Sequence, residues 1–223
     1  WEDSCGGNVY SDRLSASAFL LMITRASSMM SPITGSEASV LVPFYDLYNH
    51  RLGSWKNAQV VGNMPPFYAV QAVRDIAPGE QIHDEYRSKN DAYTADIFRD
   101  YGFVQQTPQL WKIPVPNLRV DLVFRLDYKD GREGGGLVVE FVHVPDDIER
   151  VSSFLESELV RLDSLLPRLE SWESEGRPEV PGIPSEEATK IWEYYHALFT
   201  AIGEAAGVLW YRAAMSESSD DEL

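Results

Sequence analysis

Apolar residues recur with two different periods in the two halves of this sequence, and this change constrains the fold most. Up to about residue 144 they occur in short runs bounded by proline and glycine turns, which is typical of strands and irregular structure. After that they recur at helical spacing over two long segments, Pro145–Trp172 and Ser185–Met215. Because strands come first and long helices follow, the 223-residue chain is predicted to be an α+β protein.

The first 105 residues are predicted to form short elements separated by turns. Gly102 directly follows the helical pattern of Asp91–Tyr101, and glycine is common at this position because a helix often ends on a residue in the left-handed conformation. The expected helices are Ser11–Met30, capped by Ser11 or Asp12, and Asp91–Tyr101. The expected strands are Val40–Phe44, which we interpret as buried, Gln59–Gly62, Tyr68–Val73 and Gln81–Tyr86.

The residue pattern changes between Val104 and Asp121, where three prolines indicate a connecting segment. Beyond it, Val120–Asp127 and Leu137–Val144 favour a hairpin with a long loop, and the two long helices follow. The predicted division is residues 1–107, residues 108–215, and an acidic tail over residues 216–223.

Composition excludes several classes of function. Lys and Arg number 19 against 35 Asp and Glu, a net charge of −16, which argues against a nucleic-acid partner because such binding depends on neutralising phosphates. It favours a protein partner with basic segments. The single cysteine, Cys5, excludes an internal disulfide and a cysteine-rich zinc cluster. No apolar run approaches the ~20 residues of a membrane span. The sequence does not identify the compartment; a soluble intracellular protein of the cytoplasm, nucleus or a plastid is the first expectation.

Polar residues directly follow an apolar run in Val42–His50, with sequence VPFYDLYNH. Asp46, Asn49 and His50 are spaced as metal ligands could be, and a metal-dependent hydrolase is one interpretation. No second histidine or cysteine group is spaced to complete such a site, so we expect no metal. A turn held by side-chain-to-backbone hydrogen bonds is the other interpretation.

A second segment, Ala77–Val104, contains a Gly-Glu turn, a short strand ending in tyrosine, and a helix ending in Tyr-Gly-Phe. Together the two segments resemble the C-terminal half of a SET domain of the Rubisco large-subunit methyltransferase type, which includes the actin-histidine methyltransferases. The resemblance covers Ser11–Gln105. The family's anchors occur in the family's order: Thr24-Arg25, Val42-Pro43, Asp46, Asn49-His50, Gly79-Glu80-Gln81, Tyr86 and Tyr101-Gly102-Phe103.

The resemblance implies a fold and a cofactor. It implies small curved β-sheets around a knot-like crossing, in which the Asn-His strand passes through the loop that bears the tyrosine. A mainly helical substrate-binding domain would follow. It also implies S-adenosylmethionine as methyl donor, with Asn49 and His50 as the cofactor-binding residues.

The resemblance assigns the remaining site residues to the substrate side. Arg25 and Asp46 match positions lining the cofactor and target-side-chain site. Tyr86 matches the catalytic tyrosine of the methyl-transfer channel, and Tyr101 a second aromatic near it. From the residues alone, Arg25 could instead be a helix arginine paired with Asp46, and both tyrosines could be core aromatics.

The resemblance therefore implies a protein methyltransferase that modifies lysine. A non-catalytic protein-interaction module derived from a SET domain is the alternative. Two departures bear on this choice. Arg87 stands where many family members have glycine, and the family's Gly-x-Gly strand does not precede Trp1, so we expect this chain to hold only part of the cofactor site.

Overall fold

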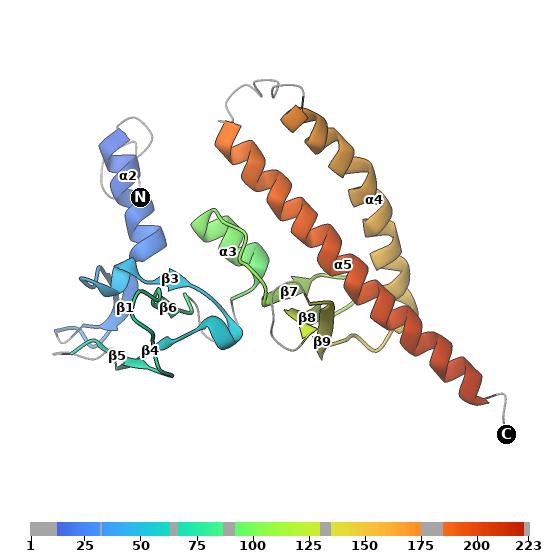
Figure 1. Ribbon diagram of the computed structural model, residues 1–223, viewed down its shortest axis with the longest axis horizontal. Coiled ribbons are helices and arrows are strands. Elements are labelled where there is room, and N and C mark those ends of the chain that lie inside the picture. The colour runs from blue at the N-terminus through green and yellow to red at the C-terminus, as the bar shows by residue number, and fades with distance from the viewer. Residues whose placement is uncertain are drawn as a thin grey trace. The chain divides into compact units, whose positions relative to one another are not determined.

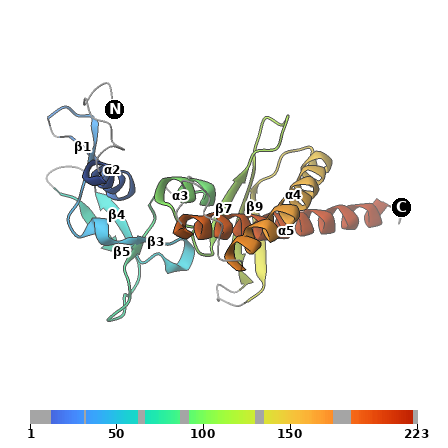
Figure 2. The ribbon, with the colours of Figure 1, turned by 90° about the horizontal axis from the view of Figure 1, so that it is seen from above.

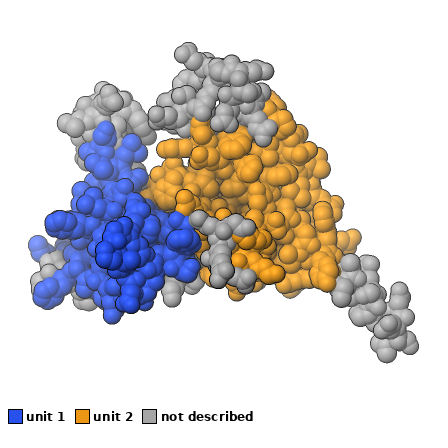
Figure 3. Space-filling model, viewed as in Figure 1, with its two compact units in different colours: residues 1–89 blue, residues 90–223 orange. Residues whose placement is uncertain are grey.

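The computed structural model describes residues 13–31, 33–62, 67–86, 92–129, 135–174 and 185–220 (Figure 1). The chain divides into two compact units, residues 1–89 and residues 90–223, which are coloured separately in Figure 3. This boundary lies before the helix that ends at Tyr101, whereas the sequence-based division lies after it. Each unit is described by itself.

Unit 1 consists of one helix and three separate two-stranded sheets. The pairs β1–β2 and β4–β5 are antiparallel, and the pair β3–β6 is parallel. Short 3-10 turns at Tyr45–Leu47 and Gly53–Trp55 flank β3. The elements are α2 (Arg13–Arg25), β1 (Ser27–Met30), β2 (Glu37–Val40), β3 (Asn49–His50), β4 (Ala58–Gly62), β5 (Ala69–Ala72) and β6 (His83–Asp84).

Two predictions for unit 1 are wrong in detail. The helix expected to reach Met30 ends at Arg25, because Ser27–Met30 pairs with β2 instead; its expected caps lie outside the described residues. A buried strand was expected over Val40–Phe44, but the observed strand, β2, ends at Val40. Phe44 is 80% exposed, with a φ of 71°. Pro43 has no N–H to donate to a ladder, and a turn forms across it, with the Asp46 N–H donating to the Val42 carbonyl at 3.1 Å.

Unit 2 begins with α3 (Thr94–Tyr101), which ends as predicted on Gly102, at a φ of 72°. The predicted hairpin is confirmed as β8 (Leu122–Tyr128) and β9 (Leu137–His143). A third strand, β7 (Gln109–Ile113), precedes it and gives the antiparallel order β7-β8-β9. The two long helices are α4 (Ile148–Ser174) and α5 (Ser185–Asp220).

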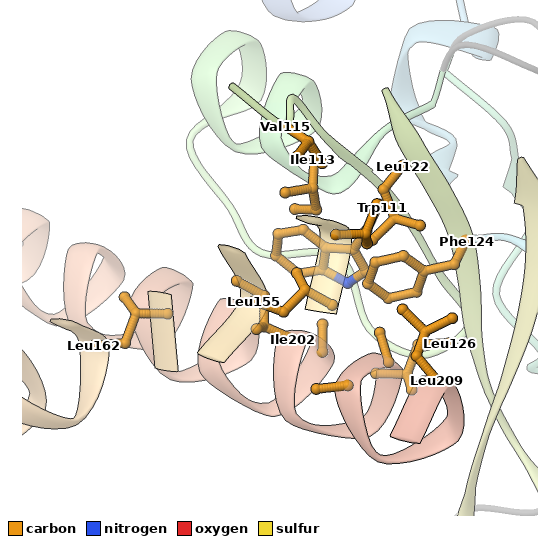
Figure 4. Close-up of a cluster of buried hydrophobic side chains, with 14 residues drawn as sticks. Trp111, Ile113, Val115, Leu122, Phe124, Leu126, Leu155, Leu162, Ile202 and Leu209 are labelled. Atoms are coloured by element: carbon orange, nitrogen blue, oxygen red, sulfur yellow. The ribbon is translucent and has the colours of Figure 1, made fainter. Parts of the chain in front are cut away.

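The hydrophobic core of unit 2 lies between this sheet and the two long helices, which run side by side along one face of the sheet (Figures 1 and 2). Trp111 and Phe124 from the strands pack with Leu155 of α4 and Ile202 of α5 (Figure 4). Burial of such apolar surface is the main stabilising contribution to a domain of this kind. The chain is thus an α+β protein, as its apolar periodicity predicts. In the described ranges, no helix has the length and apolar character that a membrane span requires.

Candidate functional site

Parallel pairing of β3 with β6 brings together the two segments that the sequence singles out. Asn49 pairs with His83, and His50 with Asp84. The Arg51 N–H donates to the Asp84 carbonyl at 3.2 Å. This pairing therefore places residues 46–50 next to residues 84–86, although more than a third of unit 1 separates them in sequence.

Arg25, the last residue of α2, joins both segments. Its Nη1 donates to the main-chain carbonyl of Asp46 at 2.8 Å and to the Tyr86 hydroxyl at 3.3 Å. The Tyr86 hydroxyl in turn donates to the Tyr48 carbonyl at 2.9 Å. A guanidinium, a phenol and two carbonyl groups from three separate segments thus meet at one half-buried place.

Asp46 meets Arg25 through its main chain and does not form with it the ion pair that one interpretation of the sequence allows. Arg25 bonds to the main-chain carbonyl of Asp46 instead. The Asp46 Oδ1 atom is buried and accepts no hydrogen bond in the described part of the chain. Because an unpartnered buried oxygen is costly, this atom is suited to a donor that a ligand brings.

His50 and Asn49, the predicted cofactor residues, form β3. His50 is 6% exposed, and its Nδ1 accepts a hydrogen bond from the Tyr86 N–H at 3.1 Å. Asn49 is half-buried, and its N–H donates to the Ile82 carbonyl at 3.4 Å. Both residues are therefore held by the pairing of β3 with β6, the strand that Tyr86 follows.

Asp84 of β6 is a buried carboxylate that stabilises the pairing of β6 with β3, and the sequence pattern did not single it out. Asp84 is 3% exposed; it accepts from the Tyr45 hydroxyl at 2.8 Å and lies 3.2 Å from the Lys56 ammonium. Burial, and then the neighbouring Asp84 charge, raise the pKa of Tyr45 well above its ordinary value, so this phenol remains a neutral donor. The only signal in the sequence was the pair of tyrosines within Val42–His50.

Glu80 and Asn57 hold the main chain that leads into β6, and these contacts give the Gly-Glu-Gln motif a structural role. Asn57 is fully buried; its Nδ2 donates to the Gln81 carbonyl at 2.9 Å, and its Oδ1 accepts from the His83 N–H at 2.8 Å. Glu80 accepts from Arg74 at 2.5 Å and from the Ala77 N–H at 2.9 Å. The glutamate therefore holds a turn in place and is not part of the site.

The turn carries a pH-dependent contribution to stability. The hydrogen bond from Arg74, followed by that from Ala77, lowers the pKa of Glu80 from 4.5 to about 2. This stabilisation is complete above pH 4.5 and is lost as the pH falls through 2. We therefore expect Glu80→Gln to destabilise the protein at pH 7, and its deficit relative to wild type to shrink on acidification through that window.

Urea unfolding at several pH values measures this deficit. Glu37→Gln, on exposed β2, is the matched control, since it removes a carboxylate that lies outside the turn. A deficit for Glu80→Gln that stays constant between pH 5 and pH 2 would contradict the assignment.

Tyr101 is the last residue of α3 and so belongs to unit 2. Its ring is half-buried and lies 6.4 Å from that of Phe103. Its assignment as a second aromatic of the site stays a prediction. The unit 1 residues Arg25, Asp46, His50 and Tyr86, in contrast, are linked by the contacts above.

Comparisons of this chain with protein-family models, with curated proteins and with solved structures find no match. In the described ranges no group of three His, Cys, Asp or Glu side chains is placed to hold a metal ion. A hydrolase based on Asp46 and His50 gains no support from these residues.

Proposed function

We propose that this chain carries the C-terminal part of a SET domain and functions in methylation of protein lysine by S-adenosylmethionine. One observation supports the proposal most: the Arg25 guanidinium bridges the Tyr86 hydroxyl and the Asp46 carbonyl. These three residues, far apart in sequence, are three of the four that the resemblance assigns to the methyl-transfer site, Tyr101 being the fourth. Their proximity is not needed for a core, because all three are only half-buried.

The residues present fit the amino-acid end of S-adenosylmethionine, which carries an ammonium and a carboxylate. The buried Asp46 Oδ1 without a donor suits the ammonium. Arg25 bonds through Nη1 alone in the described contacts, and a guanidinium binds carboxylates with two parallel hydrogen bonds. Asn49 and His50 would hold the cofactor from β3. When bound, the cofactor supplies an activated methyl group on a sulfonium.

The protein's own task is to deliver a neutral amine in line with that methyl group. With a reference pKa near 10.4, a lysine is deprotonated at pH 7 at a cost of roughly 4–5 kcal/mol. A half-buried site lowers this cost, since desolvation disfavours the ammonium. The Tyr86 hydroxyl directs its own proton to the Tyr48 carbonyl and accepts from Arg25, so its oxygen is held in one position, from which it can orient an amine N–H.

Calorimetric titration with S-adenosylmethionine tests the cofactor claim. We expect the protein to bind the cofactor, with Asp46 and Arg25 holding its amino-acid end. Absence of heat on titration would refute the cofactor claim.

A non-catalytic interaction module is the second candidate, and one observation favours it. Ala58 is the only fully buried apolar residue among those described in unit 1, while Ile33 and Phe67 are 92% and 73% exposed. Interaction surfaces commonly contain contiguous exposed apolar area, to which side chains of this size can contribute. Tritiated-methyl transfer to lysine-containing proteins separates the two candidates, since a module binds partners but transfers no methyl group.

Unit 2 supplies the charge that a basic protein substrate would meet. It holds 12 Lys and Arg against 26 Asp and Glu, a net charge of −14 out of −16 for the chain. Some of its acids have local partners: Asp147 caps α4, Glu158 pairs with Arg161, and Glu156 accepts from Trp210. Glu149, Glu193 and Glu204 have no ion-pair partner among the described residues.

Reversal of Glu149, Glu193 and Glu204 to Lys is expected to raise KM for a basic protein substrate and to leave kcat for a short peptide unchanged. Long-range attraction is screened over ~8 Å at physiological salt, so the wild-type KM should also rise with ionic strength. Steady-state kinetics at two salt concentrations measure both effects. Reversal of Glu158 is the control, and a KM insensitive to salt and to charge would leave the helices as scaffold.

A further inference from the structure

His50 differs from the other site residues because it contacts Tyr86 at the main chain rather than at the hydroxyl. The imidazole is almost fully buried, and its Nδ1 accepts the Tyr86 N–H across 36 positions of sequence. The two rings lie 5.3 Å apart between centroids, at an angle of 46°. Such a bond uses the histidine side chain as an acceptor for backbone, which no cofactor role requires.

The main chain and the hydroxyl of Tyr86 both bond to one short segment, residues 48–50. Its N–H is held by the His50 side chain, and its hydroxyl donates to the carbonyl of Tyr48, two residues earlier. Arg25 then donates to that hydroxyl. With both ends held, the position of the ring and the direction of the hydroxyl are fixed before any ligand binds, which is the preorganisation that in-line transfer needs.

We infer that His50 is a positioning residue, whose Nδ1 holds the main chain of Tyr86 and so sets where the Tyr86 hydroxyl lies. The inference rests on the proposed role of Tyr86 in methyl transfer. It assigns the His50 side chain to the main chain of Tyr86, so that any cofactor contact of residue 50 would come from its main chain. Since an acceptor Nδ1 carries no proton, neutral His50 carries its proton on Nε2.

Nuclear magnetic resonance on the wild-type protein tests the bond directly. An N–H···N hydrogen bond transmits a scalar coupling between its two nitrogens. We expect this coupling between the Tyr86 amide nitrogen and His50 Nδ1, with the Nδ1 chemical shift of an unprotonated imidazole nitrogen. A protonated Nδ1 without coupling would overturn the inference, and no variant is needed for that result.

Two substitutions then test the consequence. His50→Leu keeps similar bulk but removes the acceptor, whereas His50→Asn keeps an acceptor oxygen near the place of Nδ1. We expect the Leu variant to exchange its Tyr86 amide proton faster by on the order of tenfold, a factor that corresponds to about 1.4 kcal/mol and to a lost buried hydrogen bond. Its kcat should fall by a similar factor, with a much smaller change in cofactor affinity. The Asn variant should recover both.

The control is His143→Leu on β9, an exposed histidine that should leave the Tyr86 amide unchanged. A His50→Leu variant with weaker cofactor binding but unchanged Tyr86 exchange would refute the inference, because His50 would then act on the cofactor alone. Amide exchange requires no turnover. Altered exchange in a protein that transfers no methyl group would therefore support the positioning of Tyr86 by His50 and refute the proposed function.

Discussion

Tyr86→Phe is expected to reduce methyl transfer by on the order of 10²-fold or more, the usual effect of losing a group that orients or handles a proton. The substitution keeps the ring but removes the hydroxyl that donates to the Tyr48 carbonyl and accepts from Arg25. Cofactor affinity should fall much less, because Asp46 and the guanidinium remain. Turnover with a tritiated donor gives the rate.

Tyr211→Phe is the matched control, since Tyr211 on α5 is 67% exposed and the same hydroxyl is removed there. Wild-type turnover in Tyr86→Phe would reassign Tyr86 to the packing of unit 1. The oxygen lone pairs that we propose for amine orientation would then have to come from other groups.

Phe124→Ala is expected to destabilise unit 2 by about 3–5 kcal/mol, the range for truncation of a buried phenylalanine. Phe124 is fully buried in β8, and its ring meets that of Phe141 edge to face at 6.1 Å between centroids. Its loss leaves a cavity between the sheet and the long helices, whose apolar residues Leu155 and Ile202 line the same core.

Urea unfolding followed by circular dichroism measures this change, since most of the helix signal comes from α4 and α5. Val142→Ala on β9 is the control, because Val142 is 61% exposed and its truncation opens no cavity. A cost below about 1 kcal/mol for Phe124→Ala would show that the core closes around the smaller side chain.

The long helices and the hairpin of unit 2 could be predicted because each follows its own apolar period. Ser185 begins α5 where the sequence indicates, and Gly102 ends α3. β7 was missed because flanking prolines mask its alternation, although Leu110, Trp111 and Ile113 are all buried. Prolines just outside a strand are compatible with pairing inside it.

Unit 1 was harder to predict because its strands are short and pair with distant segments. The strand expected at Val40–Phe44 failed on a local cause, the missing N–H of Pro43. Residue patterns pointed to four individual residues, Arg25, Asp46, His50 and Tyr86. Which of their atoms are in contact depends on the pairing of β3 with β6, which the sequence does not specify. The Asp84 network, with Tyr45 and Lys56, gave almost no signal in the sequence, because buried carboxylates are recognised only by their partners.

The parallel pairing of β3 with β6 also orders events during folding. Closing a loop costs entropy that grows slowly with its length, and here His50 must find a partner 36 positions away. The β4–β5 hairpin lies wholly within that loop, and hairpins form in about 1–10 μs from local contacts. Once the hairpin has formed, the flexible part of the loop between His50 and Tyr86 is shorter, so closing this loop costs less entropy. We therefore expect the contacts between His50 and Tyr86 to form late and to break early, so that the site can open while the β4–β5 hairpin remains folded.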